Sequence, residues 1–297
     1  MLKDSASRKA FVAVNTFMLA LITIICVAPL VHLLAVSLSH NRYASAGVVG
    51  LWPRGFTLTA YSFLSERSSF LTSIFVSAQR VFLGTAINLS LCVLTAYPLS
   101  REKDQFHLRT VFVWFFAITM FFGGGLVPTY LVVNMTGIGN TIWALVLPGA
   151  LNVWHMVMML NFFRGVPKSL EEAARLDGAS HFKTLLLVYL PLSLPSLATI
   201  LLFTMVGHWN SWFDGFLYMN SPKKYPLQTY LSTLIMNPAL LSNKALITQE
   251  EIERLSSISA KTLRVAQIFL GALPIMCVYP FLQRFFIKGI VLGSVKE

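Results

Sequence analysis

Residues 166–179 read VPKSLEEAARLDGA, and this polar stretch is the most informative part of the 297-residue chain. Pro167 suits the first turn of a helix, where its missing N–H does no harm. Gly178 stands where a helix needs a left-handed residue to end, and Ser180 can cap a second helix. The pattern predicts a helix over about 169–177, which at about 1.5 Å per residue is too short to cross a membrane.

The rest of the chain is unusually apolar. Hydrophobic residues make up 56% of it, charged residues only 12%, and the mean hydropathy is +0.68. Soluble domains carry about 25% charged residues, so the composition excludes a soluble enzyme, a disordered protein and a secreted disulfide scaffold. The net charge of +11 is not gathered into a run, which argues against nucleic acid as a partner. The three cysteines lie in apolar stretches, and we expect small buried side chains rather than disulfides or metal ligands.

Six apolar segments are each long enough for a membrane-spanning helix, which needs about 20 residues. They hold about half of the chain and only one of its 35 charged side chains, Arg80. Because unpaired backbone groups are excluded from lipid, the segments must be helical, and the fold class is all-α integral membrane. The first segment is about twice as long as the apolar part of a signal peptide, so we expect it to be retained. The predicted spans are about 11–38, 70–98, 110–133, 141–163, 184–207 and 265–283.

Lysine and arginine set the predicted orientation. If the N-terminus is cytoplasmic, the inner segments hold 13 Lys and Arg in 55 residues and the outer segments 9 in 95. This bias predicts that both termini are cytoplasmic. The loop 165–183 is then cytoplasmic and the loop 208–264 lies outside. We expect one transmembrane permease domain over 1–297.

Three roles compete for the helix at 169–177. It can lie flat on the bilayer, although acidic side chains are unsuited to an anionic inner leaflet. It can be a linker. It can also dock into a groove on a soluble cytoplasmic partner, where small alanines would permit close approach.

The stretch resembles the EAA loop of ABC-importer permeases. The resemblance covers nearly the whole chain and points to the MalG-like carbohydrate-uptake branch, in the subgroup that handles complex oligosaccharides. Leu185 and Val188 depart from the family, which often has Phe and Ile there, but both remain apolar. The motifs that carry the resemblance are Glu172-Ala173-Ala174, Asp177-Gly178-Ala179, Leu190-Pro191-Leu192 with Pro195, Ala96-Tyr97-Pro98-Leu99-Ser100-Arg101, Asn140-Thr141 with Leu147-Pro148, Trp209-Asn210, Trp212-Phe213-Asp214-Gly215, Tyr225-Pro226-Leu227-Gln228-Thr229-Tyr230, Tyr279-Pro280-Phe281-Leu282-Gln283-Arg284 and Lys288-Gly289.

The resemblance implies a type I ABC-importer permease fold in a bacterial cytoplasmic (inner) membrane. It implies a heterodimeric pore with a second permease subunit, two ATP-binding subunits below and a binding protein outside. The chain is then not an enzyme and holds no cofactor, since it has no phosphate-loop motif and its partners bind ATP and Mg²⁺. The expected substrate is an oligosaccharide, with an acidic alginate or pectin fragment favoured. The residues expected to couple to the ATPase are Glu171, Glu172, Ala173, Ala174, Leu176, Asp177, Gly178 and Ala179.

Polar side chains in and near the spans are candidates for the substrate path. Arg80 either reaches water, forms an internal pair or contacts a sugar, and the amides and the histidine can equally bond neighbouring helices. A lone histidine predicts no metal site. The outer loop near 237–248 is expected either to enter the binding protein or to be passive. The candidates are Arg80, Asn88, Asn152, Trp154, His155, Trp209 and Asn210.

Two other functions remain open. A secondary transporter driven by an ion gradient would need buried carboxylates, and no Asp or Glu lies inside the predicted spans. A membrane enzyme would need converging His, Asp or Glu at one membrane face, and the sequence suggests no such cluster.

Gly178→Val is expected to uncouple transport from ATP hydrolysis, because a β-branched residue disfavours the left-handed conformation that ends the helix. Sugar uptake and ATPase activity of the assembled transporter, measured side by side, check this. Unchanged uptake with normal ATPase activity would contradict it.

Overall fold

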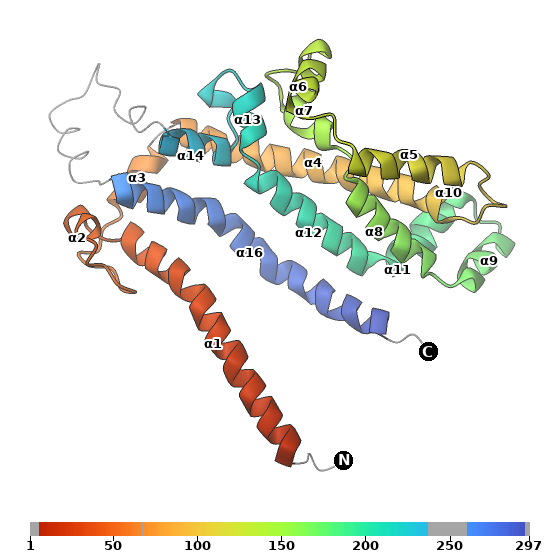
Figure 1. Ribbon diagram of the computed structural model, residues 1–297, viewed down its shortest axis with the longest axis horizontal. Coiled ribbons are helices and arrows are strands. Elements are labelled where there is room, and N and C mark those ends of the chain that lie inside the picture. Colours follow the sequence, from red (N-terminus) through yellow and green to blue (C-terminus); the bar gives the residue numbers. More distant parts are fainter. Residues whose placement is uncertain (1–5, 67, 237–259, 295–297) are drawn as a thin grey trace. The chain divides into compact units, whose positions relative to one another are not determined.

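The computed structural model describes residues 6–66, 68–236 and 260–294. Helices, and no strands, form the regular structure of this part of the chain, as predicted, and one isolated antiparallel bridge joins Ser39 to Phe56. In chain order (Figure 1) the elements are α1 (Ala6–Ser37), α2 (Asn41–Ser45), α3 (Thr59–Ser65), α4 (Ser68–Ser100), α5 (Arg109–Phe121), α6 (Leu126–Met135), α7 (Ile142–Val146), the 3-10 turn η1 (Leu147–Gly149), α8 (Val153–Arg164), α9 (Lys168–Leu176), α10 (His181–Thr184), the π-helical η2 (Leu185–Tyr189), α11 (Leu190–Leu192), α12 (Leu194–Asn210), α13 (Phe213–Tyr218), the 3-10 turn η3 (Pro222–Lys224), α14 (Leu227–Met236) and α16 (Ala260–Ser294).

The chain divides into two compact units, and the expectation of a single domain stays a prediction. The first unit comprises Met1–Ser68 and Thr233–Leu273, the second Ser69–Ser232 and Pro274–Glu297. The outer-loop segment at 237–248, expected to meet a binding protein, lies outside the described residues.

In the first unit, α1 is apolar around its whole circumference. Phe11 and Phe17 are each about 70% exposed, which is the surface expected of a helix that faces lipid. Near the end of α1, Ser37 shares a hydrogen bond of 2.7 Å with the hydroxyl of Tyr61. This bond ties α1 to α3.

In the second unit, α8 packs against α5 and α12 (Figure 1). The core between α4, α8, η2 and α12 consists of closely packed apolar side chains. Of the three cysteines, only Cys92 lies in this core; Cys26 and Cys277 are exposed, so the expectation that all three are buried is wrong. The side chains that form this core are Cys92, Val93, Ala96, Tyr97, Leu99, Met156, Met159, Leu160, Phe163, Val166, Leu185, Tyr189 and Ile200.

The predicted spans differ in regularity. Within the described residues three helices are long and apolar enough to cross a membrane, and there are up to six spans if each bent helix pair counts as one. The pair α5 and α6 is bent by 115°, α7–η1 and α8 by 50°, and α10–α11 and α12 by 81°.

Each bend has a local cause that the apolar pattern does not reveal. Gly125, at a φ of +82°, separates α5 from α6. Pro148 and Asn152 flank the second break, and Asn152 caps α8 by accepting from the backbone N–H groups of Trp154 and His155. Pro195 follows the third break, where Ser193 is non-helical. Such breaks are tolerated at membrane depth where protein surrounds them or where they line a cavity.

Candidate functional site

The first candidate site is α9, the helix expected at 169–177. Pro167 precedes it with extended backbone. Gly178 has a φ of +76° and donates its N–H to the carbonyl of Arg175 at 3.0 Å, so the predicted left-handed stop is confirmed. Ser180 caps α10, accepting from the N–H of Lys183 at 3.4 Å, as expected.

The predicted coupling residues split into an exposed face and one buried carboxylate. The side chain of Leu176 is 89% exposed, and Glu172, Ala173 and Asp177 are also exposed. Glu171 is only 7% exposed. An exposed leucine on a short amphipathic helix can enter a groove on a partner protein. The side chain of Glu171, by contrast, is buried against other segments of this chain.

The carboxylate belongs to a group of four side chains, which we name the Glu171 cluster: Tyr97, Arg101, Glu171 and Tyr189. Oε2 of Glu171 accepts a hydrogen bond of 2.8 Å from the Tyr189 hydroxyl and is paired with Nη1 of Arg101. The Arg101 guanidinium lies over the rings of Tyr97 and Tyr189, at 4.1 and 4.7 Å from their centroids. Arg175, one helical turn further along α9, approaches Oε1 at 2.7 Å. The cluster joins α9 to the end of α4 and to η2.

Burial alone would raise the pKa of Glu171, but the Tyr189 hydroxyl, Arg101 and Arg175 outweigh it and lower the pKa below the usual 4.5. The folded state therefore binds this proton less tightly than the unfolded chain. Its contribution to stability is complete above about pH 4.5 and is lost as the pH falls through the lowered pKa. A second pair beside the cluster, Lys168 with Glu102, is exposed.

The second candidate site is a polar cavity of about 460 Å³. It is lined from α4 by Arg80 and Asn88, from the broken span α7–η1–α8, and from α12 by Thr204 and His208. The walls approach closely at Gly84 of α4, where an added Cβ would overlap the His208 imidazole.

Asn88 organises one end of this cavity. Its Nδ2 donates to the carbonyl of Ala150 at 3.0 Å, and its Oδ1 accepts from the Thr204 hydroxyl at 3.1 Å. Nδ1 of His155 lies 3.3 Å from the same Oδ1. The expectation that these polar side chains bond neighbouring helices is confirmed for Asn88 and His155.

Arg80 occupies the other end, and it does not reach water: the residue is only 2% exposed. Its guanidinium forms a two-pronged ion pair with Asp214, with Nη1 at 3.1 Å from Oδ1, and donates to the carbonyl of Ser211 at 3.2 Å. Nε of Arg80 makes no hydrogen bond to any described residue. Of the three roles open for Arg80, the internal pair is the one seen.

The structure brings together only part of the predicted path. Arg80, Asn88, Asn152 and His155 line the polar cavity. Trp154 is 57% exposed and, like Trp209 and Asn210, is not among its lining residues. Phe203, Thr204 and His208 also line the cavity and carry no signal in the sequence, whereas Asp214 was singled out only as part of the motif Trp212-Phe213-Asp214-Gly215.

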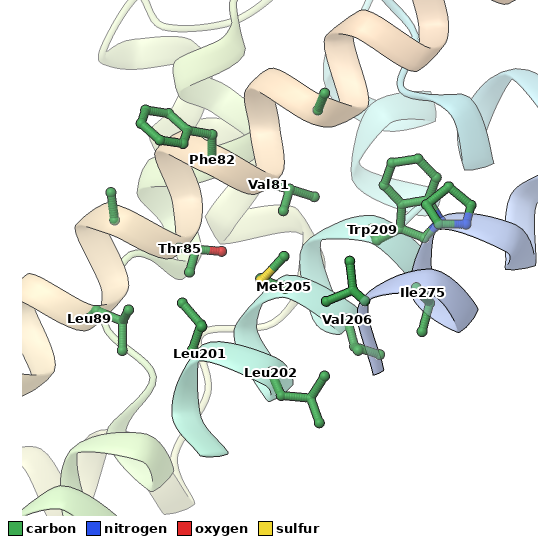
Figure 2. Close-up of a pocket in the computed structure, with 14 residues that line it drawn as sticks. Val81, Phe82, Thr85, Leu89, Leu201, Leu202, Met205, Val206, Trp209 and Ile275 are labelled. Atoms are coloured by element: carbon green, nitrogen blue, oxygen red, sulfur yellow. The ribbon is translucent and has the colours of Figure 1, made fainter. Parts of the chain in front are cut away.

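Trp209 lines a different cavity, a groove of about 450 Å³ shown in Figure 2. Leu89 and Phe82 of α4, Leu201 and Met205 of α12 and Ile275 of α16 line it with apolar atoms. Such a lining offers few hydrogen-bond partners and is unsuited to hydroxyl-rich sugars. Among the described residues no group of three or more His, Cys, Asp or Glu side chains could hold a metal ion.

The chain is similar to known proteins in both sequence and fold. Residues 108–291 match the family described as "Binding-protein-dependent transport system inner membrane component". The chain is 36% identical over 278 residues to the polygalacturonan/rhamnogalacturonan transport system permease protein YtcP of Bacillus subtilis (strain 168), covering 94% of this chain and 95% of that protein. It is 34% identical to the protein LplC of the same organism, covering 99% and 97%. A chain of a crystal structure of a bacterial ABC transporter involved in the import of the acidic polysaccharide alginate superposes with a TM-score of 0.83 at 29% identity, covering 96% of this chain and all of that one.

Arg80→Gln is expected to destabilise the protein by about 3 kcal/mol, because it leaves the Asp214 carboxylate without its countercharge in a mostly buried place. Adding Asp214→Asn should recover part of the loss, since the double variant carries no unpaired charge. Thermal unfolding of the assembled transporter in detergent checks both. Strictly additive losses would show that the two side chains do not interact.

Proposed function

We propose a substrate class and a coupling surface for this chain, which belongs to the family of binding-protein-dependent transport system inner membrane components. It is a multi-pass inner-membrane permease of a binding-protein-dependent ABC importer of the carbohydrate-uptake type. Members of this family are not catalytic, and the partner ATPase binds ATP.

The proposed substrate is an acidic oligosaccharide, such as a fragment of pectin or alginate. The observation that carries this proposal is the arginine at the end of the polar cavity, buried within a span that has no other charge. A guanidinium binds a carboxylate through two parallel hydrogen bonds, and the substrate's carboxylate would take the place of Asp214 on Arg80. The names of the relatives, which refer to polygalacturonan and alginate, support the same class.

The rest of the cavity wall is suited to sugar. Asn88, Asn152 and Thr204 offer amide and hydroxyl groups, and Phe203 and Tyr218 offer aromatic faces. A few placed polar groups beside aromatic rings are the usual composition of small-molecule sites, which measure about 300–1,000 Å³. The cavity would form this subunit's share of the substrate path.

The proposed coupling surface is the exposed face of α9, formed by Glu172, Ala173, Leu176 and Asp177. Leu176 would enter a groove on an ATP-binding subunit, with Glu172 paired to a basic group at its rim. ATP-driven approach of the two ATP-binding subunits would then move α9 as a rigid body and switch the pore between inward and outward access.

The remaining partners and the topology follow from the same assembly. A second, homologous permease subunit would complete the pore, and an extracytoplasmic binding protein would deliver the sugar. Both termini and the loop 165–183 would be cytoplasmic, in line with the Lys and Arg bias. The two compact units would then work as one permease domain. The alternative, transport driven by an ion gradient, is disfavoured by the lack of Asp or Glu inside the predicted spans.

Uptake into proteoliposomes by the full transporter is expected to require ATP, to persist when ion gradients are collapsed, and to prefer an oligogalacturonate over its methyl ester of equal length. The double variant Arg80→Gln with Asp214→Asn should lose most of this preference. Each 1.4 kcal/mol of lost discrimination between the two sugars lowers the preference about tenfold. The wild-type and the variant transporter use the same binding protein, so a difference in preference between them comes from this chain. Uptake without ATP would favour the ion-driven alternative, and an unchanged preference would remove Arg80 from the proposal.

Glu172→Ala is expected to weaken binding-protein-stimulated ATPase activity, because the anchor of α9 on the ATPase is lost. Glu102→Ala, which removes an exposed carboxylate from the neighbouring loop, serves as the control and should have little effect. An intact complex with unaltered stimulation in Glu172→Ala would contradict the anchoring role.

A further inference from the structure

We propose that Arg101 is a positioning residue that transmits movement of α9 to the polar cavity. This inference rests on the proposed coupling role of α9 and adds the route by which that helix acts on the rest of the chain. In the sequence, Arg101 stands out only as the last residue of the motif Ala96-Tyr97-Pro98-Leu99-Ser100-Arg101.

The contacts of Arg101 show that α9 is attached to the membrane-spanning helices through it. Arg101 is 7% exposed and pairs with Glu171, the residue of α9 that is turned into the chain. Its guanidinium lies over two rings that contact each other edge to face, those of Tyr97, one turn back on α4, and Tyr189, the last residue of η2. The Tyr189 hydroxyl closes the cluster by donating to the same carboxylate.

The two elements that the cluster joins to α9 lead directly to the polar cavity. Arg101 follows the last residue of α4, and α4 carries Asn88 about 20 Å away, at 1.5 Å per residue. Tyr189 continues through α11 into α12, which carries Thr204 and His208. A displacement of Glu171 is therefore passed through the Arg101 guanidinium to α4 and α12, two of the helices that line the cavity.

The chemistry of the cluster favours positioning over stability. Nε and Nη2 of Arg101 are buried and make no hydrogen bond to any described residue, so desolvation of this charge is only partly compensated. A buried ion pair of this kind is often no more stabilising than apolar side chains of the same volume. It does fix a geometry, because the guanidinium contacts two nearly perpendicular rings and pairs with a carboxylate at the same time, and its rigid planar fork holds these contacts in one arrangement.

The exposed Lys168–Glu102 pair provides a matched contrast in the same region. It also joins α9 to the segment after α4, yet both side chains are more than half exposed. A solvated pair between two long side chains holds no fixed geometry. We therefore expect the buried pair, and not the exposed one, to transmit movement.

The test compares the sugar imported per ATP hydrolysed by the assembled transporter in liposomes. Arg101→Gln and Tyr189→Phe should each lower this ratio at least about fivefold, the lower end of typical coupling effects, while ATP hydrolysis continues. Arg101→Lys should lower it less, because it keeps the charge and loses only the planar fork of the guanidinium. Glu102→Gln should leave it unchanged.

A purely structural role predicts a different result. It predicts that each variant lowers uptake and ATP hydrolysis only together, so that the complex that does assemble imports the normal amount of sugar per ATP. A normal ratio in the assembled variants would overturn the proposal. If Arg101→Gln does not assemble, the ratio in Tyr189→Phe decides, since that change removes one hydroxyl and keeps the ring. A wild-type transporter that imports no sugar with ATP would contradict the proposed function itself, which separates the two failures.

Discussion

A positive charge removed from water must have a countercharge, and α4 meets this requirement twice. Arg80 within the helix and Arg101 just after it are both buried, and each is paired with a carboxylate from a distant part of the chain. Asp214 comes from the segment after α12, and Glu171 comes from α9. Since an uncompensated charge in such a place costs several kcal/mol, these two pairs determine which segments must lie beside α4 and at which residues.

Backbone polar groups obey the same constraint, and they explain why the polar cavity lies beside a broken helix. The break between η1 and α8 releases the carbonyl of Ala150, which Asn88 takes up, and Asn152 satisfies two N–H groups at the start of α8. An uninterrupted helix would keep the carbonyl of Ala150 in its own hydrogen-bond ladder, out of reach of Asn88. The bend therefore supplies polarity at membrane depth without adding a charge.

The sequence predicts the helical class, the approximate spans and the start and end of α9, because each depends on local composition and on capping residues. It does not predict the bends, since glycine and proline are also tolerated in unbroken membrane helices. It also leaves the partners of the arginines open, because these are contacts over 70 and 134 residues of sequence. One signal was available: a buried Arg80 near the outer end of its span requires an acid, and on the predicted outer side the acids are few, namely Glu66, Asp214, Glu250, Glu251 and Glu253. For Glu171 the sequence offered no such signal, because two adjacent glutamates on a short helix do not reveal which one is buried.

The π-helical turn η2 has a consequence for how this region can change in evolution. A π-turn holds about one residue more than an α-helical turn, so each of its residues rotates the chain by less than the roughly 100° of an α-helix. The extra residue is therefore taken up within Leu185–Tyr189, and the segments on either side keep the faces that they would have in a regular helix. A deletion of one residue here would restore regular winding without turning α10 or α11 to another face, so related chains should tolerate a one-residue difference in length here, provided that the tyrosine over Arg101 is kept.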